Sequence, residues 1–257
     1  MDPSPQDVAA RRDRLERWVE EQQRWMQEQQ RLMDQLPDRL PWWTRLRKAV
    51  TKGKRVARGS QWFARRVLYR GLDMGISNEP EHDHPDRTWY VSSPWYALPR
   101  ALHYVGVSDS DTFIEFGCGK GVVVHQAARR PFRRVIGVEI SPVLAEIART
   151  NLAARRHQHK CRNVEIVVAD VAEYSVPDDL TIGYLFHPVA NETLDALLQG
   201  IIDSIDRRPR RVRLIYVYPL QSSRVLATGR FRLVKEQVNK LLEPSFNPPR
   251  TEIFESL

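Results

Sequence analysis

Short apolar runs alternate with longer amphipathic or polar segments over the C-terminal part of the chain. Seven of these runs have the length and the β-branched or aromatic content of strands: 113–116, 134–140, 164–170, 182–186, 212–218, 231–238 and 251–255. Helical patterns at 97–104 and 122–130 flank the first strand, and another helix opens at Ser141 and Pro142, which suit the N-cap and the first turn. Strands that alternate with helices predict a doubly wound, mostly parallel α/β sheet.

A glycine-rich loop follows the first of these strands, where residues 113–121 read FIEFGCGKG. Three alternating glycines let the backbone approach a nucleotide-sized ligand, and the next helix directs its N-terminus at that ligand. A dinucleotide fingerprint would need a glycine where Val122 stands, and the phosphate loop ending in GK[ST] is absent. The acid before the glycines, Glu115, would repel a pyrophosphate but suits a cationic ligand such as S-adenosylmethionine.

This E-x-G-x-G-x-G loop resembles the first motif of the class I S-adenosylmethionine-dependent methyltransferases and matches it at every defined position. An ordinary tight strand-to-helix turn is the alternative. The resemblance implies a seven-stranded sheet in the order 3-2-1-4-5-7-6 with the seventh strand antiparallel. It also implies S-adenosyl-L-methionine as the cofactor, S-adenosyl-L-homocysteine as the product, and cofactor binding by Glu115, Gly117, Cys118, Gly119 and Gly121.

Two further acids stand at predicted strand ends. Glu139 lies 18 residues after Gly121, where an acid can accept hydrogen bonds from both ribose hydroxyls, and Ile140 follows it. Asp170 ends the third run; in the resembled family this acid binds the adenine amino group, so Asp170 and the adjacent Val171 are candidate adenine contacts. Each acid alone could be a solvated strand end, but three at matching strand ends favour a cofactor site.

The acceptor should bind outside the carboxyl ends of the strands, beyond the fourth run, where residues 186–189 read FHPV. Amino-directed relatives carry Asn-Pro-Phe or Asp-Pro-Pro-Tyr here, so His187 and Val189 weaken an amino-group assignment. His187 is the candidate catalytic base for a hydroxyl nucleophile, with a structural role as the alternative. Tyr90 is a candidate lid over the cofactor, because many bacterial relatives carry a Tyr-x-Pro-Thr-like block at this place.

The N-terminal extension is predicted to be helical. Within residues 1–40 a seven-residue unit recurs, and its large apolar side chains form one stripe: Leu15, Trp18, Val19, Trp25, Met26, Leu32, Met33 and Leu36. Homodimerisation through this helix and docking on the chain's own catalytic domain are both consistent with the stripe. Residues 41–87 follow as a basic arm and a polar loop, and the methyltransferase domain is expected to span residues 88–257.

The basic arm carries most of the charge asymmetry. Residues 44–70 contain ten Lys or Arg and no acid, against a net charge of +8 for the chain. Such a segment suits a phosphate backbone, an anionic membrane surface or an acidic substrate, and a solvated amphipathic helix is the plainer alternative. Two cysteines exclude a disulfide framework or a zinc site, and the absence of an apolar leader or span predicts a cytoplasmic protein.

These patterns predict methyl transfer to an oxygen or nitrogen of an unidentified acceptor, with a small molecule or protein favoured. A nucleic-acid methyltransferase steered by the basic arm is one alternative. A catalytically silent subunit that binds the cofactor and recruits a partner is another, suggested by the altered block around His187.

Overall fold

The computed structural model describes residues 72, 92–186, 191–238 and 250–257, and these carry the structural statements that follow. The predicted N-terminal helix, the basic arm and polar loop apart from residue 72, Tyr90 and His187 lie outside the described residues. Among the described residues, no helix is long and apolar enough to cross a membrane.

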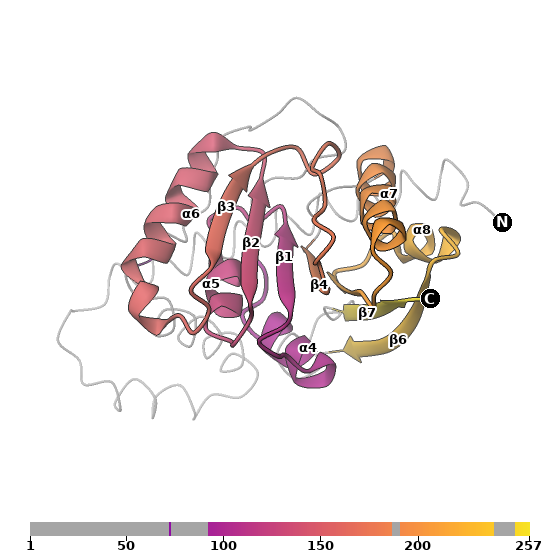
Figure 1. The fold of residues 1–257 in the computed structure, drawn as a ribbon, viewed down its shortest axis with the longest axis horizontal. Coiled ribbons are helices and arrows are strands. Elements are labelled where there is room, and N and C mark those ends of the chain that lie inside the picture. The colour runs from indigo at the N-terminus through magenta and orange to yellow at the C-terminus, as the bar shows by residue number, and fades with distance from the viewer. Residues whose placement is uncertain (1–71, 73–91, 187–190, 239–249) are drawn as a thin grey trace, which may run out of the picture. The chain divides into compact units, whose positions relative to one another are not determined.

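The predicted sheet is confirmed. Seven strands form one sheet in the order β3-β2-β1-β4-β5-β7-β6 (Figure 1). The strands are β1 (Thr112–Phe116), β2 (Arg134–Glu139), β3 (Val164–Val168), β4 (Ile182–Phe186), β5 (Arg213–Val217), β6 (Phe231–Val238) and β7 (Arg250–Ser256). The first five strands pair in parallel, and β7 pairs antiparallel with both β5 and β6. The carboxyl ends of β1 to β5 therefore lie at one edge of the sheet, called here the C-terminal edge.

Helices cover both faces of the sheet. They are α4 (Ala97–Val105), α5 (Val122–Ala128), α6 (Pro142–Ala154), α7 (Asn191–Arg207) and α8 (Ser222–Ala227), with a 3-10 turn at Arg156–Gln158. Strand side chains alternate between the faces: Phe113 packs with residues of α4 and α5, whereas Ile114 packs with residues of α7. Because both faces are covered, all five residues of β1 are buried.

The N-terminus of α6 forms as the sequence predicts. The Ser141 hydroxyl accepts a hydrogen bond from the backbone N–H of Leu144 at 3.2 Å, and Pro142 is the first helical residue. On β2, a Cβ added at Gly137 would lie 2.7 Å from the Cys118 Sγ, so this strand leaves room for the glycine-rich loop only because it lacks a side chain there. The sequence of β2 thereby controls how closely the loop approaches the sheet.

Two buried histidines join α5 to the segment after α6. The Nδ1 of His125 and the Nε2 of His159 are 3.0 Å apart, so one ring nitrogen donates to the other and the pair shares one proton between these atoms. Burial lowers the pKa of His125 to about 4, with smaller contributions in the same direction from the neighbouring His159, Arg129, Arg155 and His157. Burial also lowers the pKa of His159, and here Arg156 adds to the effect.

Acidification is therefore expected to destabilise the fold. The unfolded chain takes up a proton near the ordinary histidine pKa of 6.5, whereas folded His125 does so only at about 4. Between these values the unfolded state binds more protons, so the free energy of unfolding should fall by about 1–2 kcal/mol from pH 7.5 to pH 5. Urea denaturation at the two pH values measures the loss. His125→Gln should lose part of this dependence, and exposed His103→Gln should keep it; equal pH dependence in both variants would contradict the assignment.

Candidate functional site

The glycine-rich loop between β1 and α5 has a backbone that needs glycine. Gly117, Gly119 and Gly121 have φ angles of 79°, 49° and 75°, a left-handed conformation that other residues adopt at a cost. The N–H groups of Gly117 and Cys118 both donate to the Val138 carbonyl, at 2.8 and 2.9 Å. A Cβ at Gly121 would lie 2.9 Å from the Cβ of Ala148, so the loop passes close to α6.

Glu139 holds this loop from the end of β2. One carboxylate oxygen accepts from the Gly119 N–H at 2.6 Å, and the other accepts from the Ser141 N–H at 3.1 Å. The side chain is only 6% exposed, so both bonds form away from bulk water. Glu139 therefore connects the glycine-rich loop to the end of β2 and the start of α6.

Glu115 lies in the middle of β1, below the loop. Its carboxylate accepts a hydrogen bond from the Val124 N–H at 3.1 Å, in the first turn of α5, where the helix dipole favours a negative charge. Burial raises the pKa of Glu115 well above its usual range, and the charge of Glu139 acts in the same direction. A cation bound near Glu115 would favour its ionised form.

The third predicted acid lies slightly beyond its strand. β3 ends at Val168, so Asp170 stands in the turn that follows, where its carboxylate accepts from the Ala172 N–H at 3.1 Å. The Ala169 N–H donates to the Glu139 carbonyl at 3.0 Å and so fixes the end of β3 against the end of β2. Ile140 is half-buried and Val171 is buried beside these acids. The structure thus brings the sequence-predicted residues from the loop, Glu139, Ile140, Asp170 and Val171 to the C-terminal edge.

An aromatic pair that the sequence analysis did not identify lies at the same edge, after β4 and β5. The rings of Phe186 and Tyr218 are 5.8 Å apart between centroids and meet at 70°. Tyr218 has φ 52°, which is rare for a bulky side chain and typical of strain kept at functional sites. Asn191, with φ 50°, exchanges hydrogen bonds with the Gln221 side chain nearby. Pro219, directly after the predicted strand 212–218, was a signal for this turn.

The segment before α4 is tied to the centre of the sheet. The Ser93 hydroxyl and the Tyr184 hydroxyl of β4 form a buried hydrogen bond of 2.5 Å. The Gln126 side chain of α5 also donates to the Trp95 carbonyl at 2.9 Å. These two hydrogen bonds fix residues 93–95 next to β4 and α5. Tyr90 itself lies outside the described residues.

Comparison with known proteins agrees with this architecture. A family model described as a methyltransferase domain matches residues 113–206, which include the loop, Glu139, Asp170 and the end of β4. No curated protein matches the sequence.

Solved structures resemble the described fold at low sequence identity. A candidate RNA methyltransferase from Pyrococcus horikoshii gives a TM-score of 0.50 at 14% identity, over 77% of this chain and 98% of that one. An RNA methyltransferase from Salinibacter ruber, in complex with S-adenosyl-L-homocysteine, gives 0.43 at 19% identity, over 64% and 92%. TrmN from Thermus thermophilus gives 0.49 at 16% identity, over 65% of this chain and 50% of that protein, so the chain spans about half of its length. At these identities the likeness shows the fold alone.

Proposed function

We propose that the chain is a class I S-adenosylmethionine-dependent methyltransferase whose acceptor is an oxygen or nitrogen nucleophile held at the carboxyl ends of β4 and β5. The observation that carries the proposal is the loop of left-handed glycines whose Gly119 N–H donates to Glu139. The loop, Glu139 and Asp170 lie at the same edge of the sheet. They are the groups expected to bind a nucleoside that carries a cationic side chain.

The residues at this edge fit S-adenosylmethionine. Glu139 would accept hydrogen bonds from the ribose hydroxyls, and Asp170 with Val171 would hold the adenine ring. The backbone at residues 117–121 admits a close ligand, since the positive φ angles are already adopted and no side chain projects from the glycines. Buried Glu115 and Glu139 would complement a cation, because a cation bound beside Glu115 would favour its ionised form. S-adenosylmethionine supplies an electrophilic methyl group on a sulfonium.

Positioning is the main catalytic contribution we infer for the chain's own residues. In-line displacement needs the nucleophile held in one direction with water excluded, and such orientation can contribute about 7–11 kcal/mol. Phe186 and Tyr218 would form an apolar wall for the acceptor, because both rings also pack against the buried cluster on the α4 and α5 face. His187 directly follows Phe186 in the sequence and would remove a proton from a hydroxyl acceptor.

The class of acceptor is open to two candidates. A small molecule or protein is favoured by the sequence pattern at residues 186–189, which departs from that of amino-directed relatives. A nucleic acid is favoured by the charge of +8 and by an uncompensated basic groove described below. The two candidates share the same cofactor site and differ only in what binds beyond β4.

One experiment separates the acceptor classes. The full chain is incubated with S-adenosylmethionine labelled in the methyl group and with host lysate fractionated into nucleic acid, protein and small molecules. Label that enters one pool identifies the class, and calorimetry with S-adenosylhomocysteine tests cofactor binding independently. If neither molecule binds, the assignment of the glycine loop and Glu139 as a cofactor site is wrong.

A further inference from the structure

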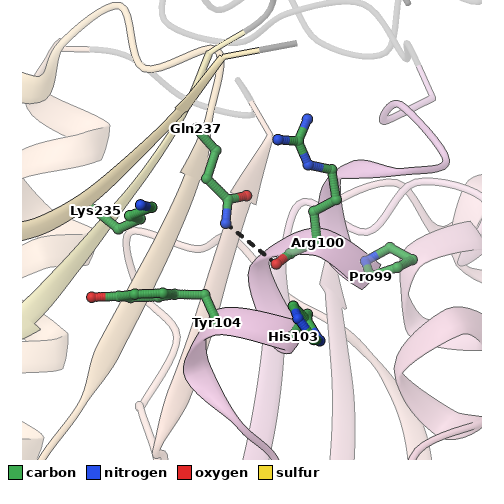
Figure 2. A pocket seen from close by; sticks show the side chains of 6 residues that line it. All are labelled: Pro99, Arg100, His103, Tyr104, Lys235 and Gln237. Carbon is green, nitrogen blue, oxygen red and sulfur yellow. Dashed lines mark hydrogen bonds between the residues drawn. The ribbon is translucent and has the colours of Figure 1, made fainter.

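A shallow groove of about 560 Å³ lies between α4 and the edge strand β6 (Figure 2). It shares no residue with the glycine-rich loop, which lies between β1 and α5. Its walls are formed by four residues of α4 and two of β6: Pro99, Arg100, His103, Tyr104, Lys235 and Gln237.

Hydrogen bonds across the groove fix its two walls. The Gln237 side chain donates to the Arg100 carbonyl at 3.3 Å, and the Tyr104 hydroxyl donates to the Val234 carbonyl at 3.2 Å. Figure 2 shows Lys235 beside the Tyr104 ring, and its Nζ is 5.6 Å from the ring centroid. The pairing of β6 with β7 shifts register between Leu233 and Lys235, an irregularity that re-aims side chains on an edge strand. The groove is therefore preorganised by contacts between segments far apart in the sequence.

The groove carries positive charge that nearby acids do not compensate. Other basic residues at this end of the sheet form ion pairs: Arg230 with Asp206, Arg232 with Glu255, and Arg250 with Glu236 and Glu252. Arg100 and Lys235, by contrast, have no ion pair within the described part of the chain. None of the described residues that line the groove is an acid. A concave surface with two such cations attracts anions.

The groove leads to the C-terminal edge of the sheet. β6 runs in the same direction as β5, and its last residue, Val238, pairs with Arg250. The Arg250 carbonyl accepts from the Tyr218 N–H at 2.9 Å, so the end of β6 is level with the aromatic pair. β6 is two strands away from β5 and three from β4, which corresponds to roughly 10–15 Å. A few nucleotides of a single strand span that distance.

We propose that this groove binds the phosphodiester backbone of a single-stranded nucleic acid and directs it toward Phe186 and Tyr218. The proposal rests on the proposed function, whose acceptor class it names. Arg100 and Lys235 would contact phosphates, His103 and Gln237 offer further polar atoms, and the Tyr104 ring, 47% exposed, offers a surface for base stacking. The basic segment at residues 44–70 would be repelled by these cations, which argues against it as the occupant.

The test compares matched variants of the full chain in their binding of fluorescent single-stranded RNA and DNA at several salt concentrations. Arg100→Gln combined with Lys235→Gln removes the two groove cations that have no ion pair among the described residues, and the Arg100 carbonyl that accepts from Gln237 stays in place. Losing two phosphate contacts should reduce the slope of log K against log salt by about 1.4, and affinity near 100 mM salt should fall roughly tenfold or more. Arg232→Gln removes one exposed charge from the same strand, where Glu255 keeps Arg213 as a partner, and should change neither quantity.

Three results of the binding measurement would overturn the proposal. They are no binding of either nucleic acid by the unmodified chain, an unchanged salt slope in the double variant, and an equal loss in Arg232→Gln. A double variant that changes only the oligomeric state in light scattering would instead assign the groove to a second copy of the chain, and would also overturn it. Binding of S-adenosylhomocysteine is measured on each variant, so failure of the cofactor site is recognised separately from failure of the groove.

Discussion

Replacing Glu139 with alanine is expected to weaken the binding of S-adenosylhomocysteine by about 1.5–3 kcal/mol, which is roughly a 10- to 150-fold rise in the dissociation constant. The alanine variant would lack the charge-assisted hydrogen bonds that the carboxylate is proposed to accept from both ribose hydroxyls. It would also release the Gly119 N–H and the Ser141 N–H, which the carboxylate now holds at 2.6 and 3.1 Å. Isothermal titration calorimetry measures the change directly.

Two further variants make this result interpretable. Glu146→Ala removes a solvent-exposed acid from α6 and should leave the affinity unchanged. Glu139→Gln keeps the side-chain length and one acceptor oxygen, so its loss should be intermediate even if the alanine variant has a less stable loop. Urea denaturation without ligand reports that stability separately. Full affinity in both Glu139 variants would remove Glu139 from the cofactor site.

The strands were predictable because of how they are buried. A parallel strand covered on both faces is an almost continuous apolar run, as β1 and β4 are, so its limits show in the sequence. The third run was predicted to reach Asp170, but β3 ends at Val168, because the Asp170 carboxylate binds the Ala172 N–H and turns the chain. The strand order was not visible in periodicity. It came from the family resemblance, since local patterns do not encode which strands pair.

The helices were also only partly predictable, because contacts with distant residues set some of their ends. α5 ends at Ala128, two residues before its predicted end, where the carbonyl of Ala128 accepts from Lys160 and Cys161 instead of continuing the helix. α7 was not predicted, although its buried residues at Leu194, Leu197, Leu198 and Ile201 follow the spacing of an amphipathic helix. That signal was available in the sequence.

The candidate site was partly predictable for a chemical reason. The loop glycines lie directly after β1 and Glu139 lies at the end of β2, at fixed spacings, so a sequence motif can identify them. Glu115 was predicted as a countercharge for the ligand, and the structure adds a second role for it, as the acceptor for the Val124 N–H of α5. The groove could not be predicted, because Tyr104 and the Val234 carbonyl that holds it are 130 residues apart in sequence.

His187→Ala is expected to lower the rate of methyl transfer by about 100-fold or more if His187 is the general base, and to leave the affinity for S-adenosylhomocysteine nearly unchanged. His187 directly follows β4, where relatives place the residue that contacts the nucleophile. A base matters only for an acceptor that is protonated at the working pH, so the effect depends on a hydroxyl acceptor. The measurement is single-turnover transfer with the acceptor identified by methyl labelling.

The pH profile distinguishes a base from a residue that only supports the structure. With the unmodified chain and a hydroxyl acceptor, the rate at saturating substrate should rise with pH through an apparent pKa near that of histidine, since the neutral ring is the active form. His187→Ala should lose this rise, whereas His157→Ala, which removes an exposed histidine, should retain it. Full turnover with an unchanged profile in His187→Ala would exclude the base. Catalysis would then depend on positioning beside Phe186 and Tyr218, and an acceptor that is already nucleophilic at neutral pH would become the better proposal.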